Sequence, residues 1–254
     1  MKPSFLNHDH PLFTVMIQTK TADSAIRTIH RAIPEGADAF GLQTCQLLSE
    51  CRNIATYQRI FAELEGKPVY ITNYRHHAND GVDDDGIAAG LIMATEAGGT
   101  LMDVMGDMFD RQIDELAVDT KAIDKQKKLI DRIHDKGGEV LMSSHVLKYT
   151  PAERVLEIAY AQQERGADVV KIVTGANTPE EEIENLRITH LLKQELKVPF
   201  LFLSGGSNNR MHRRFGCHFG CCMYLCVYEH DELATPSQPN IRHLKAMLEN
   251  FEKA

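Results

Sequence analysis

The sequence predicts a (β/α)8 barrel, in which eight parallel strands close into a cylinder and helices cover its outside. The chain of 254 residues contains eight short apolar runs, and longer amphipathic patterns separate them. Eight strand–helix units in about 250 residues are what such a barrel needs. The main competitor is an open doubly wound sheet, which usually has a glycine-rich phosphate turn after its first strand, and "IQTKTADSA" has none. No linker or change in composition divides the chain, so we expect residues 1–254 to form one barrel domain.

The eight apolar runs are the expected strands, and their carboxyl ends should meet at one mouth of the barrel. Residues at those ends, and in the loops just beyond them, are where barrel enzymes place their chemistry. In chain order the runs are Phe13–Thr19, Asp38–Leu42, Pro68–Asn73, Thr100–Met105, Glu139–Ser144, Asp168–Val173, Pro199–Ser204 and Cys222–Val227.

Two of the separating helices show clear start signals. "TPAERVLEIAYAQQERG" has Thr150 as its expected cap and Pro151 at its first position, and it should end at Gly166. "NTPEEEIENLRITHLLKQEL" repeats this start with Thr178 and Pro179, and its first turn is rich in acids, which the helix dipole favours.

Composition and charge exclude several classes of function. The chain has 28 basic and 36 acidic residues and a net charge of -8, whereas a nucleic-acid-binding protein would show a basic stripe. No segment approaches the roughly 20 apolar residues that span a bilayer. The N-terminal "MKPSFLNHDHPLF" lacks the apolar core of a signal peptide. We therefore expect a soluble, cytoplasmic protein that binds neither nucleic acid nor a membrane.

Four of the six cysteines cluster near the C-terminal end, in a C-x3-C-C-x3-C pattern. This spacing matches no zinc or iron–sulfur pattern. A role as small buried residues is favoured over a metal or redox role. The four are Cys217, Cys221, Cys222 and Cys226.

A lysine lies in the middle of the sixth run, "ADVVKIVTGA". Alternation along a strand puts Lys171 on one face with Val169 and Val173, and we expect that face to point into the barrel. Burial there penalises the ammonium form and should leave an uncharged amine. Such an amine condenses with a ketone or aldehyde to give a Schiff base. The alternative is a structural lysine that reaches the rim or pairs with an acid.

His145 follows the fifth run and should therefore lie at the mouth, beside the strand that carries Lys171. Adjacent strand ends are about 5 Å apart, so the imidazole could reach a substrate held on the lysine. Imidazole titrates near neutral pH and can transfer protons in both directions. The pairing favours a general acid/base over a loop histidine that only bonds to the backbone.

"SSHVLKYTP" followed by "ADVVKIVTGA" resembles the type I 3-dehydroquinate dehydratases of the shikimate and quinate pathways. The resemblance implies a (β/α)8 barrel that uses neither metal nor cofactor, and relatives are often homodimers. In this family a strand-six lysine forms an imine with the substrate ketone. A histidine at the end of strand five removes an α-proton and assists loss of the β-hydroxyl as water. The matching residues here are Lys171 and His145.

The C-terminal part carries a further resemblance. "PFLFLSGGSNNRMHRRFGCHFG" is similar to the segment whose arginine binds the substrate carboxylate, and counting back from "FG" gives that role to Arg213. Guanidinium suits bidentate binding of a carboxylate. "ATPSQP" is similar to the loop that closes over the substrate with a serine and a glutamine. Gln238 matches the glutamine, and the serine position falls on Ala234, with Thr235 and Ser237 nearby.

Strand two departs from the family pattern. The family places a glutamate, an arginine and an aspartate on alternate positions there, and these charged groups help to bind the ring hydroxyls. This chain has Gly41, Gln43 and Cys45 at those positions. Loss of the charged groups should weaken binding of 3-dehydroquinate or indicate a different substrate.

Other charged positions are only partly retained. Arg75 is the candidate for the family's strand-three arginine, but it lies one residue after the family's position. On a regular strand this offset would turn the Arg75 side chain to the other face. On strand four, Asp103 remains as an expected substrate contact, while Met105 replaces an acid. Asp80 is the candidate for the acid that supports the histidine.

The sequence thus predicts a Schiff-base lyase for a small carboxylated β-hydroxy ketone, with 3-dehydroquinate as the default substrate. Four alternatives stay open. They are another class I Schiff-base lyase or aldolase, a metal-dependent isomerase or epimerase, an enzyme for a phosphorylated substrate held at Gly205–Gly206, and a non-catalytic metabolite-binding relative. The metal hypothesis would use His76, His77, Asp103, Asp107 and His145.

Overall fold

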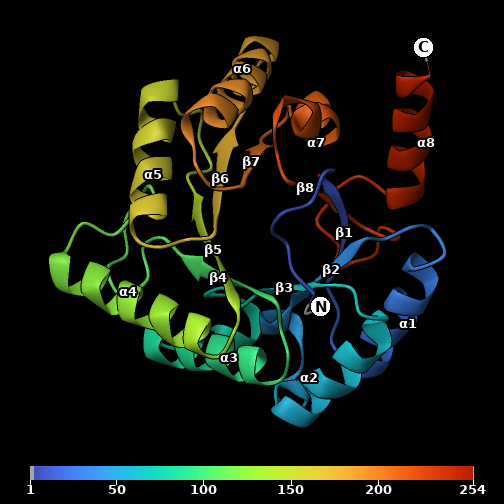
Figure 1. Cartoon of the computed structure of the whole chain (residues 1–254), viewed down its shortest axis with the longest axis vertical. Coiled ribbons are helices and arrows are strands. Elements are labelled where there is room, and N and C mark those ends of the chain that lie inside the picture. The colour runs from blue at the N-terminus through green and yellow to red at the C-terminus, as the bar shows by residue number, and fades with distance from the viewer. Residues whose placement is uncertain (1–2, 254) are drawn as a thin grey trace.

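The computed structural model describes residues 3–253, and eight parallel strands form a nearly closed barrel at its centre (Figure 1). The predicted fold class is confirmed, and each strand lies on a predicted apolar run, with ends shifted by at most two residues. The strands are β1 Leu12–Ile17, β2 Ala39–Gln43, β3 Val69–Thr72, β4 Leu101–Met105, β5 Glu139–His145, β6 Val169–Gly175, β7 Phe200–Gly205 and β8 Met223–Cys226.

Helices alternate with the strands and lie outside the barrel (Figure 1). The α-helices are α1 Ala22–Ala32, α2 Ile54–Phe61, α3 Asp84–Glu96, α4 Thr120–Asp135, α5 Ala152–Glu164, α6 Pro179–Glu195, α7 Arg210–Phe215 and α8 Ile241–Glu252. Short 3₁₀ helices are η1 Thr44–Gln46, η2 Ser49–Cys51, η3 Ala62–Leu64, η4 His77–Asn79 and η5 Gly216–Phe219.

The strands are joined in the order β7-β6-β5-β4-β3-β2-β1-β8. Neighbours pair in parallel, for example Ser143 of β5 with Lys171 of β6. Between β7 and β8 the gap is bridged by a backbone hydrogen bond from Cys222 N to Phe200 O, 2.9 Å long. This parallel arrangement brings the carboxyl ends of all eight strands to the same mouth.

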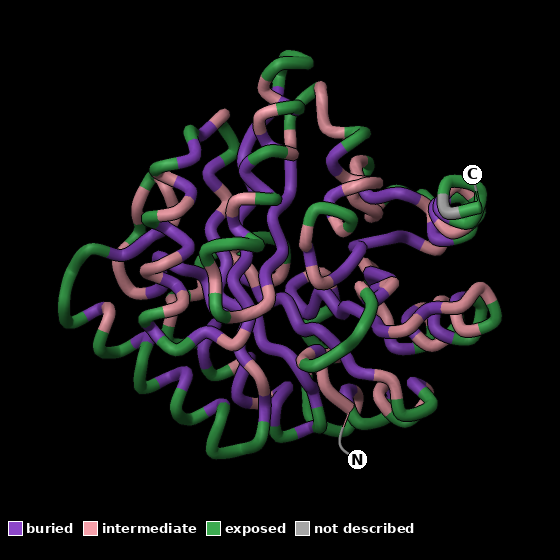
Figure 2. The backbone as a smooth tube through the Cα atoms, turned by 45° about the horizontal axis from the view of Figure 1, so that its top comes forward, coloured by how far each residue is buried: buried purple, intermediate pink, exposed green. Residues whose placement is uncertain are grey.

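The strands are buried on both faces, which explains why they are apolar runs and not alternating patterns. Every residue of β2, β3, β4, β6 and β8 is buried. The burial is concentrated in the barrel wall, and exposed residues lie on the outer helices and loops (Figure 2). A polar side chain on an inner face is therefore enclosed by other side chains unless it reaches the mouth.

One of the two predicted helix starts is confirmed, and the other is wrong in its cap. Thr178 caps α6 by accepting a hydrogen bond from Glu181 N, and Pro179 is in the first turn. At α5 the capping position falls on Pro151, one residue later than expected. The Thr150 hydroxyl donates to the Lys148 carbonyl, and the start of α5 has no side-chain cap.

All six cysteines, each within residues 3–253, are free thiols. Cys221 and Cys226 are buried, and Cys221 Sγ donates to Phe202 O at 3.3 Å. Burial raises the pKa of Cys221 to about 12, so this thiol stays protonated at neutral pH. Within the same range, no helix combines the length and apolar character needed to cross a membrane.

Candidate active site

A cavity of about 460 Å³ opens at the carboxyl ends of the strands. Four residues that the sequence singled out line it together: Lys171, His145, Arg213 and Gln238. They come from β6, the end of β5, α7 and the loop between β8 and α8. The cavity thus collects groups from several strand ends, as expected for the catalytic face of a barrel.

Lys171 points into the barrel, as the alternation along β6 predicts. Lys171 and Val173 both line the cavity, and the Lys171 side chain is only 5% exposed. Its amine lies 2.6 Å from Tyr74 Oη and 3.0 Å from Tyr70 Oη. It also lies 3.2 Å from Asp103 Oδ2. The alternation along the strand did not reveal a partner for this amine, and the structure supplies one in the buried carboxylate of Asp103.

Asp103 supports the amine and does not line the cavity, since its side chain has no exposed surface. Ser143 Oγ donates to Oδ1 at 2.5 Å, and the hydroxyls of Tyr70 and Tyr74 donate to Oδ2. Burial raises the pKa of Asp103, but the charge of Lys171 and the hydrogen bonds to the carboxylate outweigh burial and leave the pKa below its usual value. The expected role as a substrate contact is corrected: enclosed by its partners, Asp103 positions the lysine.

His145 is held by an acid from the loop after β4. Its Nδ1 and its backbone N–H both donate to Glu115 Oε2, at 2.9 and 2.7 Å. Donation from Nδ1 leaves Nε2 of the neutral ring without a proton, so Nε2 can act as a base. The expectation that Asp80 fills this role was wrong. Asp80 is exposed, whereas Glu115, at a φ of 44°, reaches the imidazole.

Replacing Glu115 with glutamine is expected to lower kcat about 100-fold. The new amide can donate to Nδ1 of His145 and so move the imidazole proton to Nε2, where it blocks the base. Steady-state kinetics measure the loss. Asp114→Asn is the matched control, because Asp114 is the neighbouring acid and pairs with Arg154 outside the cavity. Equal kcat values for the two variants would contradict the assigned role.

The state of Glu115 also predicts a pH dependence of stability. Burial raises the pKa of Glu115, but the hydrogen bond and charge of His145 outweigh burial and leave the pKa lowered. An unfolded glutamate titrates near pH ~4.3, so the ionised group stabilises the fold above that pH and the gain is lost as pH falls through the lower, folded pKa. The free energy of unfolding of the wild type should approach that of Glu115→Gln at pH ~3. Urea unfolding at pH ~7 and ~3 measures this, and a gap that widens in acid would contradict it.

Arg213 presents a cation to the cavity without a counter-charge. Its Nε donates to Ser204 O at 2.7 Å, and it forms no ion pair with any residue in the range 3–253. Arg213 lies on α7, and Glu182 holds the start of this helix by accepting hydrogen bonds from the backbone N–H groups of Met211 and His212. Burial lowers the pKa of Arg213 to about 10, which leaves it charged at neutral pH and favours an anionic ligand.

Three side-chain oxygens at the cavity are buried and have no hydrogen-bond partner in the described part of the chain: Gln238 Oε1, Thr72 Oγ1 and Gln46 Oε1. Gln238 and Thr72 are only 6% and 2% exposed. A buried polar atom without a partner costs free energy. Hydroxyl groups of a bound ligand could satisfy these oxygens.

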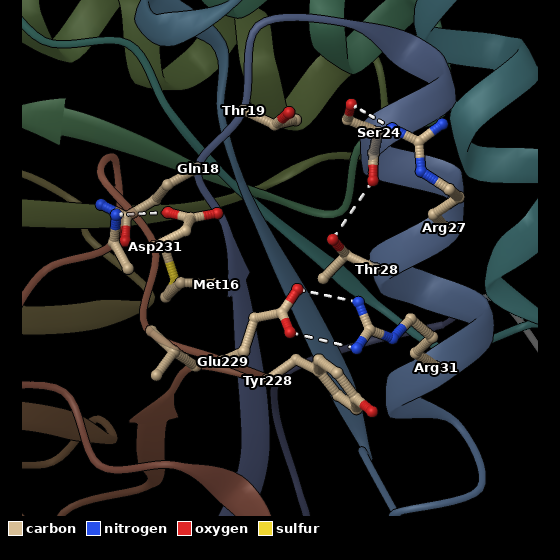
Figure 3. A pocket seen from close by; sticks show the side chains of 12 residues that line it. Met16, Gln18, Thr19, Ser24, Arg27, Thr28, Arg31, Tyr228, Glu229 and Asp231 are labelled. Atoms are coloured by element: carbon tan, nitrogen blue, oxygen red, sulfur yellow. Dashed lines mark hydrogen bonds and ion pairs between the residues drawn. The ribbon is translucent and has the colours of Figure 1, made fainter.

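The loop between β8 and α8 covers one side of the mouth and is tied down from two directions. On the inner side, Gln18 Nε2 donates to Thr235 Oγ1 and Thr235 N donates to Gln18 Oε1, both at 2.9 Å. On the outer side, Arg31 from α1 binds both oxygens of Glu229, across a second cavity of about 180 Å³ (Figure 3). Met16 and Gln18 at the end of β1 and Ala234 of the loop line both cavities, so these two segments together form the wall between them.

Arg75 does not reach the cavity. It binds both carboxylate oxygens of Asp84, at 2.7 and 2.8 Å, and Asp107 at 2.7 Å. The one-residue offset turns it toward the start of α3 and the loop after β4, and Tyr74 takes the place at the mouth. Arg75 is therefore corrected from a substrate contact to a residue that joins two loops.

The acids and histidines near the mouth do not gather around one point. Asp107 pairs with Arg75, and Asp103 pairs with the cavity lysine. His76 and His77 line the cavity with their rings edge to face, 4.6 Å apart. Across residues 3–253, no three histidine, cysteine, aspartate or glutamate side chains are grouped so that they could hold a metal ion.

The chain is similar to known 3-dehydroquinate dehydratases in sequence and in fold. The family model for type I 3-dehydroquinase matches residues 13–254. A 3-dehydroquinate dehydratase of Klebsiella pneumoniae is 25% identical over 94% of this chain and 92% of its own. One from Alkaliphilus oremlandii is 28% identical over 51% of each chain. The solved structure of the Geobacillus kaustophilus 3-dehydroquinate dehydratase has a TM-score of 0.81 at 14% identity and covers 96% of this chain and 92% of its own, a likeness of fold. The chain belongs to the type I 3-dehydroquinase family.

Proposed function

We propose that this protein is a hydro-lyase that removes water from 3-dehydroquinate through an imine on Lys171. The observation that carries the proposal is that one cavity holds a buried amine, an acid-supported imidazole and an unpaired guanidinium. These three groups match the needs of a substrate with a ketone, an acidic C–H beside it and a carboxylate.

The chemistry follows from the imine. The Lys171 nitrogen replaces the ketone oxygen, and the protonated C=N bond draws electrons from the neighbouring carbon. His145 Nε2 then takes the α-proton, and the C–H electron pair forms an enamine. That pair returns as the β-carbon loses its hydroxyl, which leaves as water with the proton that His145 returns. Hydrolysis of the imine frees a conjugated enone and restores the amine.

Arg213 and Gln238 support the choice of substrate. The guanidinium can bind a carboxylate with two parallel hydrogen bonds. The unpaired Gln238 oxygen lies on the same cavity, where it can accept a hydrogen bond from a ring hydroxyl.

Replacing Arg213 with lysine is expected to raise KM about 10- to 100-fold and to change kcat little. The lysine keeps the charge but loses the bidentate geometry, and hydrogen bonds to charged groups contribute roughly 1.5–3 kcal/mol. Substrate-saturation curves measure the shift. Arg214→Lys is the matched control, since Arg214 is adjacent and does not line the cavity. An unchanged KM in Arg213→Lys would exclude Arg213 as the carboxylate ligand.

A second candidate is a Schiff-base lyase for a different β-hydroxy ketone, and the neutral wall at strand two favours it. A Cβ at position 41 would overlap Met16 Sδ, so the methionine fills the space of the family's first charged group. Gln43 accepts a hydrogen bond from Gln18 at 3.0 Å. Cys45 Sγ lies 3.7 Å from His76 Nδ1. The ring hydroxyls of a bound substrate would face the amide groups of Gln18 and Gln43 here, where the family has charged side chains.

The deciding experiment is to incubate the pure protein with 3-dehydroquinate and follow the absorbance of the conjugated enone. Steady turnover is expected. A protein that gives no enone but can be trapped by borohydride with other β-hydroxy ketones would support the second candidate. Absence of both reactions would overturn the proposed function.

A further inference from the structure

Tyr74 lies between the two groups of the proposed reaction. It follows β3, lines the cavity and is partly exposed. Its Oη is 2.6 Å from Lys171 Nζ and 2.5 Å from Asp103 Oδ2. Its ring meets that of His145 edge to face, with centroids 5.2 Å apart. The tyrosine hydroxyl is thus the polar group closest to the amine, and its side chain lines the cavity that would hold the substrate.

We propose that Tyr74 is a catalytic residue that carries protons from the Lys171 nitrogen to the ketone oxygen while the imine forms. The inference rests on the proposed function, because it presupposes an imine on Lys171. The proton transfers are then divided between two residues. Tyr74 protonates the ketone oxygen that the imine displaces, and His145 takes the proton of the α-carbon and protonates the β-hydroxyl.

The proton balance needs no further reactant. In the first transfer the ammonium gives one proton to Tyr74 Oη, and the tyrosine passes its own proton to the ketone oxygen. The freed lone pair forms the C–N bond, and the C=O π pair becomes the hydroxyl of a carbinolamine, whose nitrogen carries the positive charge. In the second transfer the same route delivers another proton to that hydroxyl. The C–O bond breaks, water leaves with its electron pair, and the nitrogen lone pair forms the protonated C=N bond. Tyr74 ends as it began.

The surroundings allow the Tyr74 hydroxyl to turn from Asp103 toward the substrate. The carboxylate then still accepts from Tyr70 and from Ser143, so it stays hydrogen-bonded. Of the groups beside the amine, Tyr74 is the best placed to reach the ketone oxygen. Asp103 does not line the cavity. Tyr70 does line it, but Tyr70 is 0% exposed and its hydroxyl lies 3.0 Å from the amine, whereas Tyr74 is partly exposed and its hydroxyl lies 2.6 Å away.

Tyr74 holds its proton at rest. Burial raises the pKa of Tyr74 well above its usual value, and the charge of Asp103 raises it further. The side chain is therefore a phenol, which can donate one proton only when it receives another. That is the requirement for a relay in which both transfers are coupled.

Exchange of the ketone oxygen with ¹⁸O-labelled water tests the proposal, because exchange needs imine formation and its reversal but no elimination. The experiment uses His145→Ala, which should return labelled 3-dehydroquinate. Adding Tyr74→Phe should slow exchange about 100-fold or more, the scale of general acid–base catalysis. Tyr70→Phe is the matched variant: it removes the other hydroxyl at the amine and should slow exchange less than about 10-fold.

Equal exchange in His145→Ala with and without Tyr74→Phe would overturn the proposal. So would loss of exchange on His145→Ala alone while borohydride still traps the wild-type imine, because that result assigns these protons to His145. Absence of both exchange and a trapped imine in the wild type would instead refute the proposed function.

A second measurement separates a proton relay from a merely distorted site. With substrate deuterated at the α-carbon, Tyr74→Phe should show a kinetic isotope effect close to one, because imine formation has become the slow step. Glu115→Gln should show a clear isotope effect, since its defect lies in proton removal. A clear isotope effect in Tyr74→Phe would contradict the relay.

Discussion

Replacement of Lys171 with alanine is expected to abolish dehydration of 3-dehydroquinate, with a loss of roughly 10⁴- to 10⁶-fold, the scale seen when a covalent nucleophile is removed. No other lysine lines the cavity in the described range, so no second amine can form the imine there. Enone absorbance measures the loss. Lys148→Ala is the matched control, because this lysine lies near the mouth, is 65% exposed and is absent from the cavity.

Loss of Lys171 should also destabilise the fold, and this has to be separated from the loss of chemistry. Asp103 would remain buried without its counter-charge, which costs about 3–5 kcal/mol in other proteins. The double variant Lys171→Ala with Asp103→Asn should recover most of that stability in urea unfolding, yet stay inactive. A double variant that regains turnover would contradict a nucleophilic role for Lys171.

Replacement of His145 with alanine is expected to lower kcat by roughly 10³- to 10⁴-fold while imine formation persists. The variant lacks the group that removes the α-proton and protonates the leaving hydroxyl, and general acid–base catalysis contributes up to ~10⁴-fold. The variant keeps the amine and its partners Tyr70, Tyr74 and Asp103, and of these only Tyr74 loses a ring contact with His145. Borohydride should therefore trap more substrate on the variant than on the wild type at equal times, because the imine accumulates.

The control for His145→Ala is His190→Ala, an exposed histidine on α6 that hydrogen-bonds only to Gln194 in the described range. It should retain full turnover. The assigned role of His145 would be wrong if its alanine variant kept turnover within tenfold of the wild type. It would also be wrong if the trapped adduct disappeared together with the activity.

The sequence was sufficient to predict the barrel and to place Lys171 and His145 together at its mouth. Strands that are buried on both faces appear in the sequence as apolar runs. A lysine inside such a run indicates a special role, because burying its charge costs free energy. Arg213 and Gln238 were located by resemblance, and the structure brings both to the cavity of Lys171. Each of these predictions depends on one position along one strand or loop.

Contacts across the barrel could not be predicted in this way. Period-two alternation says which residues of a strand point inward, but not which inward residues of separate strands meet. The ion pair of Lys171 with Asp103, and the hydroxyls of Tyr70 and Tyr74 around it, depend on the mutual register of β3, β4 and β6. Glu115 was missed for another reason: it lies in an irregular loop at a positive φ, where no periodic signal exists.

The most direct test is borohydride reduction of the wild-type protein in the presence of 3-dehydroquinate, followed by mass mapping of the peptides. We expect a single reduced adduct, attached at Lys171, that forms only with substrate and disappears in Lys171→Ala. An adduct on another lysine, or rapid turnover with no adduct at any time point, would contradict an imine at the centre of this barrel.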